Sequence, residues 1–177
     1  MWSLRSVGIA IGMVLASAVT VGTGTLSAGP ASAAPVNNCV SSQIKVSHGP
    51  AQGTAGTTYY AVVFTNKGAA CAIWGVPTIQ AVKGTVHHPI GPLARSLSMG
   101  MMPVRQVVAK GHSVSVAIGV TDTGNYTPSK CVPAQADGIL VTLGSFVHST
   151  YLHLPISVCT KLPSVTTKLI VPGTTGI

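Results

Sequence analysis

An alternating segment in the middle of the chain constrains its fold most strongly. Residues 113–121 read SVSVAIGVT, in which Val114, Val116, Ile118 and Val120 are separated by smaller side chains. Successive side chains of a β-strand point to opposite faces, so this period of two places the four large residues on one face. A helix would scatter them around its axis. The segment therefore predicts a strand with one face in a core.

Other parts of the chain carry strand signals too. Residues 58–65, TYYAVVFT, are apolar at both alternating positions, which predicts a central strand covered on both faces. Further candidates are residues 43–47, 78–82, 104–108, 138–143, 152–159 and 164–171, separated by turn signals at 66–68, 83–84, 110–111 and 137–138 and by long loops at 86–102 and 122–136. About eight short strands with such spacing predict an all-β, antiparallel β-sandwich with little helix after residue 34.

The first 33 residues are typical of a secretory signal peptide. Arg5 is the only charge before the apolar stretch 7–21, and Ala31-Ser32-Ala33 supplies a small-x-small cleavage site. An uncleaved anchor is the alternative, because residues 7–26 are uncharged, although their second half is rich in Gly, Thr and Ser. We predict cleavage after Ala33 and no stable membrane insertion afterwards. A single domain then spans 34–177, with its core at about 37–172.

All four cysteines follow the predicted signal peptide. They are Cys39, Cys71, Cys131 and Cys159, and no two are spaced as C-x-x-C. An even number of cysteines in an exported chain indicates disulfides rather than a zinc site. Three pairings are possible. We predict Cys39–Cys71 and Cys131–Cys159, because these bonds close loops of similar, moderate length.

Several short strings occur in an order that resembles a known family. They are AGTTYY at 55–60, VFTNKG at 63–68, CAIWGVP at 71–77, GHSV at 111–114, DTGNY at 122–126 and CVP at 131–133. With the four cysteines, this ordered set is similar to an exported actinobacterial domain-of-unknown-function family, number four-two-three-two. The resemblance implies a secreted or envelope-anchored domain, an immunoglobulin-like sandwich and no established catalytic residues. Many relatives are lipoproteins, and this chain departs from that pattern because no lipobox precedes Cys39.

Carboxylate side chains are almost missing. The chain has no Glu, and its two acids, Asp122 and Asp137, stand in turn-like strings that contain glycine. Glycoside hydrolysis needs paired carboxylates, a serine triad needs an acid, and calcium or magnesium sites need several. We therefore predict that the protein is not an enzyme and has no cofactor, and that both aspartates form turns.

The chain is strongly basic, with 10 Lys and Arg against 2 acids and a formal charge of +8. The cations are dispersed rather than clustered with aromatic residues, which argues against nucleic acid as a partner. A diffuse basic surface aids solubility and also suits an anionic partner. We predict a secreted or cell-envelope-associated binding module whose envelope or extracellular partner the sequence does not identify.

Residues 87–103, HHPIGPLARSLSMGMMP, raise the question of copper. His88 and Met99 have ten residues between them, which is similar to the first half of the His-x10-Met motif of exported copper chaperones. Imidazole and thioether ligands suit copper(I). The second half, His-x-Met, is missing. A third ligand would have to come from Met101, Met102 or His112. We assign no metal site and favour plain loop packing, with a partner-contact loop and a copper(I)-binding, chaperone-like protein as alternatives.

Overall fold

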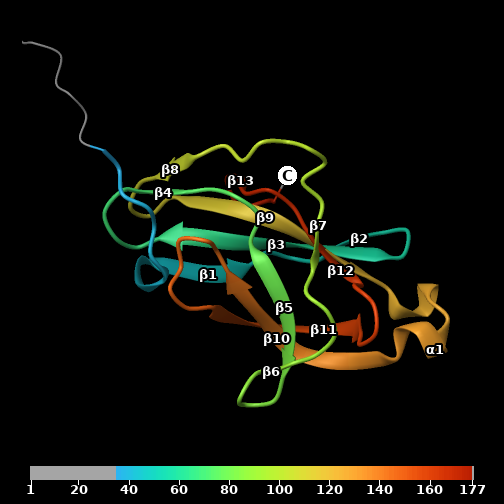
Figure 1. Ribbon diagram of the computed structural model, residues 1–177. Coiled ribbons are helices and arrows are strands. Elements are labelled where there is room, and N and C mark those ends of the chain that lie inside the picture. Colours follow the sequence, from blue (N-terminus) through green and yellow to red (C-terminus); the bar gives the residue numbers. More distant parts are fainter. Residues whose placement is uncertain (1–34, 177) are drawn as a thin grey trace, which may run out of the picture. The chain divides into compact units, whose positions relative to one another are not determined.

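The computed structural model describes residues 35–176 (Figure 1). The predicted signal peptide lies outside the described residues. Within them, α1 (Pro128–Cys131) is the only α-helix, and two 3-10 turns, η1 (Ser41–Gln43) and η2 (Thr123–Asn125), accompany it. No helix in this part of the chain has the length and apolar character needed to cross a membrane. The expectation of little helix after residue 34 is therefore confirmed.

Seven strands form the larger sheet, in the order β1-β3-β9-β12-β7, with β2 also paired to β3 and β13 to β9. Their bounds are β1 Ile44–His48, β2 Gln52–Thr54, β3 Thr57–Asn66, β7 Arg95–Ser96, β9 Ser113–Thr121, β12 Val165–Thr167 and β13 Val171–Pro172. The pairs are antiparallel except β12 with β7, which run parallel.

Four strands form the second sheet, in the order β11-β10-β5-β6, and β4 pairs with β8 in a separate ribbon. Their bounds are β4 Cys71–Ile73, β5 Thr78–Lys83, β6 His88–Pro89, β8 Gln106–Val108, β10 Pro133–Thr142 and β11 Thr150–Cys159. The core joins apolar residues of both sheets, such as Phe64 and Ile118 from one with Ile79 and Ile139 from the other. The layers are visible in Figure 1 and confirm the predicted all-β sandwich.

The central strands match their sequence signals. The observed bounds of β9 are those of the alternating segment, and Val116 and Ile118 are fully buried. Ser115, Ala117 and Gly119 on its other face are buried too. Residues near the end of the chain lie over Ser115, where the Gly176 N–H donates to Ser115 Oγ at 2.9 Å. In β3, consecutive burial of residues 62–64 confirms a strand covered on both faces.

Four expected features are wrong. The loop predicted at 86–102 contains the short strands β6 and β7, and the loop predicted at 122–136 contains η2, α1 and the start of β10. The turn predicted at Asp137-Gly138 is a bulge inside β10, where the register shifts between Ala136 and Gly138. Glycine is needed there because a Cβ at Gly138 would overlap the Leu152 carbonyl oxygen and lie 2.6 Å from the Tyr151 ring. The single strand predicted at 164–171 is divided into β12 and β13. Between them, the Ile170 N–H turns away to donate to the Gly75 carbonyl at 3.0 Å.

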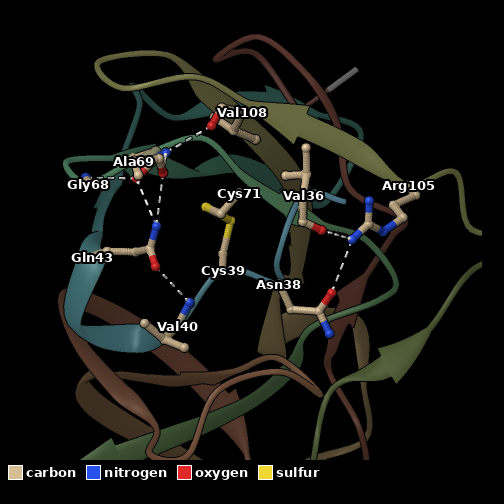
Figure 2. Close-up of a disulfide and its surroundings, with 11 residues drawn as sticks. Val36, Asn38, Cys39, Val40, Gln43, Gly68, Ala69, Cys71, Arg105 and Val108 are labelled. Atoms are coloured by element: carbon tan, nitrogen blue, oxygen red, sulfur yellow. Dashed lines mark hydrogen bonds between the residues drawn. A yellow bond between two sulfur atoms is a disulfide. The ribbon is translucent and has the colours of Figure 1, made fainter. Parts of the chain in front are cut away.

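Both disulfides form with the predicted pairing. Cys39–Cys71 ties the start of the domain to β4, and Cys131–Cys159 ties α1 to the end of β11. Figure 2 shows the first bond inside a network of hydrogen bonds. The bonds join cysteines 32 and 28 residues apart in the sequence. Loops of this size stabilise a fold by about 3–4 kcal/mol each on the chain-entropy estimate.

Candidate functional site

An exposed apolar loop joins β7 to β8, and we call residues 97–105 the Met loop. In Figure 1 this segment runs along the outer edge of the molecule. Met99 is 80% exposed and Met102 83% exposed, and Met101 and Val104 are also exposed. Single exposed apolar residues are ordinary on protein surfaces, but a contiguous group marks a contact site. The Met loop is the strongest candidate for such a site in the described chain.

The tip of the Met loop is a tight turn. The Met101 N–H donates to the Ser98 carbonyl at 2.9 Å, and the residues between them, Met99 and Gly100, have φ angles of 49° and 75°. Two successive positive φ angles are typical of a type I′ turn, which favours Asn, Asp or Gly. Methionine in this conformation costs about 1–2 kcal/mol. Met99 therefore stands in a strained position, although its side chain is mostly in solvent.

Both ends of the Met loop are fixed. At one end the Leu97 N–H donates to the Thr167 carbonyl at 2.8 Å. At the other end Arg105 Nη2 donates to the Val36 carbonyl at 2.6 Å and to Asn38 Oδ1 at 3.3 Å, as Figure 2 shows. Because hydrogen bonds hold both ends, the backbone at Leu97 and Arg105 is fixed in place, and the exposed side chains lie between these two residues.

Three basic residues lie in or near the Met loop in the sequence. Arg95 lies on β7, Arg105 closes the loop, and Lys110 follows β8. All three are exposed. The sequence contains no carboxylate side chain before Asp122, so this region is basic as well as apolar.

The structure places the two suggested copper ligands in different elements. His88 belongs to β6, opposite Lys83 at the edge of the four-stranded sheet. Met99 follows β7, an edge strand of the seven-stranded sheet, so the predicted loop 86–102 crosses from one sheet to the other. Among residues 35–176, no three His, Cys, Asp or Glu side chains gather as a metal site would require.

The other suggested ligands, Met101, Met102 and His112, are all exposed. The two methionines lie in the Met loop. His112 lies in the turn after β8, where its backbone N–H donates to the Ala109 carbonyl at 3.0 Å. The structure therefore gathers three methionines, Met99, Met101 and Met102, within one short loop.

The first of the adjacent histidines has a different role. The His87 ring stacks on the Tyr151 ring with centroids 4.0 Å apart and an angle of 15° between the planes. The Tyr151 hydroxyl donates to the Asp137 carbonyl at 3.3 Å. This contact joins the β5–β6 turn to β11. The sequence held no signal for it, because the two rings are far apart along the chain.

Each aspartate accepts a hydrogen bond from a glycine backbone. Asp122 Oδ1 accepts from the Gly124 N–H at 2.8 Å and caps η2. Asp137 Oδ2 accepts from the Gly84 N–H at 2.8 Å and holds the β5–β6 turn from the neighbouring strand. Asp122 thus has the expected turn role, whereas Asp137 stabilises a turn other than its own.

A small hollow that sequence reasoning missed lies on the seven-stranded sheet. It has a volume of about 160 Å³ and is lined by residues that include Tyr59, Gln52 and Lys168. The Lys168 ammonium lies 5.8 Å from the centroid of the Tyr59 ring. A Cβ at Gly119 would lie 2.9 Å from that ring, so the glycine allows the tyrosine to pack closely against β9. The hollow is smaller than most ligand sites.

Comparison with known proteins identifies one family. The family model described as Domain of unknown function (DUF4232) matches residues 39–171. No curated protein and no solved structure matches the chain. The matched range begins at Cys39 and ends at Val171, so it includes both disulfides and the whole Met loop.

Proposed function

The chain belongs to the family described as Domain of unknown function (DUF4232), and we propose that it is a secreted or cell-envelope-associated, non-catalytic binding module that uses the Met loop. Disulfides persist in oxidising compartments outside the cytoplasm. The two disulfides of this domain therefore support the proposed location.

The exposure of the Met loop is the observation that carries the proposal. Burying a methionine side chain is worth about 1.5–3 kcal/mol, and the loop leaves most of that gain unused in the isolated domain. Met99 also holds a left-handed conformation. A partner that covers the loop would recover the burial energy, which explains why these side chains face solvent on a fixed base.

The state of the two aspartates supports a role without catalysis. Asp122 and Asp137 both accept hydrogen bonds from backbone N–H groups of turns. A general acid or base must instead reach the proton that it transfers. With no Glu in the chain, no other side-chain carboxylate is available for that work.

Copper(I) binding is the second candidate function. It is favoured by the three exposed thioethers of Met99, Met101 and Met102, since thioethers are soft ligands. The position of His88 on the other sheet favours the contact-loop proposal instead. Thioethers alone would form a weaker site than the mixed set with His88 suggested by the sequence.

An envelope-binding assay tests the proposal. The domain from residue 34 onward, in its oxidised form, is mixed with envelopes isolated from the producing cells and sedimented. We expect the wild type to be retained and Met101→Asp/Met102→Asp to be lost. The matched control is Val86→Asp/Val147→Asp, which makes the same charge change outside the Met loop. These two valines are also apolar and are 71% and 78% exposed. Equal retention of all three proteins would refute the proposal.

A further inference from the structure

The Met loop has the features of a segment that enters the surface of a lipid bilayer. We propose that it docks on an anionic membrane, with its apolar side chains at the boundary between headgroups and acyl chains and the neighbouring cations on lipid phosphates. This inference rests on the proposed function and names the chemistry of the partner. The docking is interfacial and needs no membrane-spanning segment.

The shape and composition of the loop favour a fluid partner. Its tip projects Met99, Met101 and Met102 from a two-residue turn rather than from a flat strand face. Methionine side chains are unbranched and adapt to irregular surroundings, which suits insertion among acyl chains. Val104 continues the exposed apolar surface toward the base. Interfacial segments bind in proportion to the apolar area they bury and to their attraction to anionic lipids.

The base of the loop carries the residue types that favour the headgroup level. The Arg105 guanidinium lies 5.3 Å from the centroid of the Trp74 ring, and Trp74 is 38% exposed. Tryptophan is enriched where membrane meets water, and arginine keeps its charge at that level while its stem packs on apolar groups. The apolar tip and the Trp74–Arg105 pair thus follow the order expected for a segment entering a bilayer from water.

The charge of the domain is complementary to an anionic surface. Arg95 precedes the loop along the chain, Arg105 closes it and Lys110 follows β8, and all three are exposed. Arg105 uses Nη2 for the Val36 and Asn38 oxygens, and a guanidinium has further N–H groups for a phosphate. Each cation near an anionic leaflet strengthens binding by roughly fivefold. The excess of 10 cations over 2 acids adds long-range attraction.

Restraint at both ends of the loop reduces the ordering cost of docking. The Leu97–Thr167 hydrogen bond holds one end, and Arg105 holds the other against Val36 and Asn38, next to the Cys39–Cys71 disulfide (Figure 2). Binding elements that are already fixed lose less conformational entropy on association. The side chains remain free to adapt while the backbone base is set.

Vesicle binding with a built-in fluorophore tests the inference. Trp74 is the only tryptophan after residue 33, so its emission reports directly on the base of the loop. The oxidised domain is titrated with vesicles of equimolar phosphatidylcholine and phosphatidylglycerol, and in parallel with pure phosphatidylcholine. We expect a blue shift of Trp74 emission and flotation with the anionic vesicles, both weakened by added salt, and much weaker binding to the neutral ones.

Two pairs of variants separate the apolar and charged contributions. Met101→Asp/Met102→Asp should lower vesicle partitioning about tenfold or more, whereas Val86→Asp/Val147→Asp should change it less than about threefold. Lys110→Glu should weaken binding to anionic vesicles more than Lys83→Glu, which makes the same charge reversal at the end of β5 in the four-stranded sheet. Unchanged far-ultraviolet circular dichroism will show that each variant is folded.

The outcomes separate this inference from the proposed function. Met-dependent retention on envelopes without binding to anionic vesicles would overturn the lipid inference and leave the binding module standing, with a protein or glycan as its partner. Vesicle binding that is unaffected by Met101→Asp/Met102→Asp would also overturn the inference. If the domain binds neither envelopes nor anionic vesicles, both proposals are refuted.

Discussion

The guanidinium of Arg105 packs over the ring of Trp74 at 5.3 Å from its centroid and joins three parts of the domain. Trp74 follows β4, Arg105 precedes β8, and Arg105 Nη2 also donates to the Val36 carbonyl near the start of the domain. The antiparallel register of β4 and β8 pairs Ile73 with Gln106. Trp74 is the next residue after Ile73 and Arg105 is the residue before Gln106, so the same pairing brings them together.

Replacing Arg105 by Ala should therefore loosen the start of the domain and the base of the Met loop. We expect the free energy of unfolding to fall by about 1–2 kcal/mol, from the loss of one cation–π contact and of charge-assisted hydrogen bonds at an exposed site. Trp74 emission should shift in the folded protein. Arg105→Lys is the informative comparison, because it keeps the charge but not the planar group. Full stability of Arg105→Ala would show that these contacts contribute nothing.

Asn66 is fully buried and forms a polar hub at the end of β3. Its Nδ2 donates to the Val108 and Ala69 carbonyls, both at 2.8 Å, and its Oδ1 accepts from the Gly68 N–H at 2.8 Å. Asn66→Ala should lower the free energy of unfolding by about 3–5 kcal/mol, because it leaves buried groups without partners. Urea unfolding followed by circular dichroism measures this loss.

Asn125→Ala serves as the control for Asn66. Asn125 makes one exposed hydrogen bond, from Nδ2 to the Gly56 carbonyl at 3.0 Å, and its loss should cost about 1 kcal/mol or less. Equal destabilisation by the two substitutions would contradict the role of Asn66 as a buried hub.

The aspartates give a direct test of the prediction that the protein is not an enzyme. Asp122→Ala removes the cap of η2 and should cost about 1 kcal/mol of stability, while Asp122→Asn keeps an acceptor oxygen and should cost less. We expect the purified domain to show no turnover of envelope glycans, peptides or esters, with or without either substitution. A hydrolytic activity in the purified domain that Asp122→Asn or Asp137→Asn abolishes would prove this expectation wrong.

Copper(I) titration addresses the second candidate function. We expect weak, non-stoichiometric binding that His88→Ala/Met99→Ala barely alters. His88 lies on β6 of the four-stranded sheet, Met99 lies in the Met loop after β7, and the second half of the chaperone motif is missing. Competition with a copper(I) chelator provides the measurement. Stoichiometric binding that survives the chelator in the wild type but not in the double variant would establish a copper site.

Local pattern predicted much of the core. The alternation at 113–121 predicted β9 because successive side chains of a strand point to opposite faces. This period of two can be recognised without knowing which strands lie beside the segment. The doubly apolar segment 58–65 predicted a covered central strand for the same reason. The cysteine pairing followed from loop length, and both bonds are present in the structure. The sequence pattern also pointed to the methionines of the Met loop, but it grouped Met99 with His88, which lies on β6 of the four-stranded sheet.

Contacts between distant segments depended on the tertiary structure. Gly138 looked like part of a turn because glycine is common in turns, but it serves the close approach of β10 to β11. The alternation in β9 predicted only one face in a core, and the burial of Ser115 on the other face depends on residues near the end of the chain, where the Gly176 N–H donates to Ser115 Oγ. Strand pairing and chain return use backbone groups that every residue carries, so side-chain pattern does not encode which segments meet. The Trp74–Arg105 base of the Met loop arises from that pairing alone.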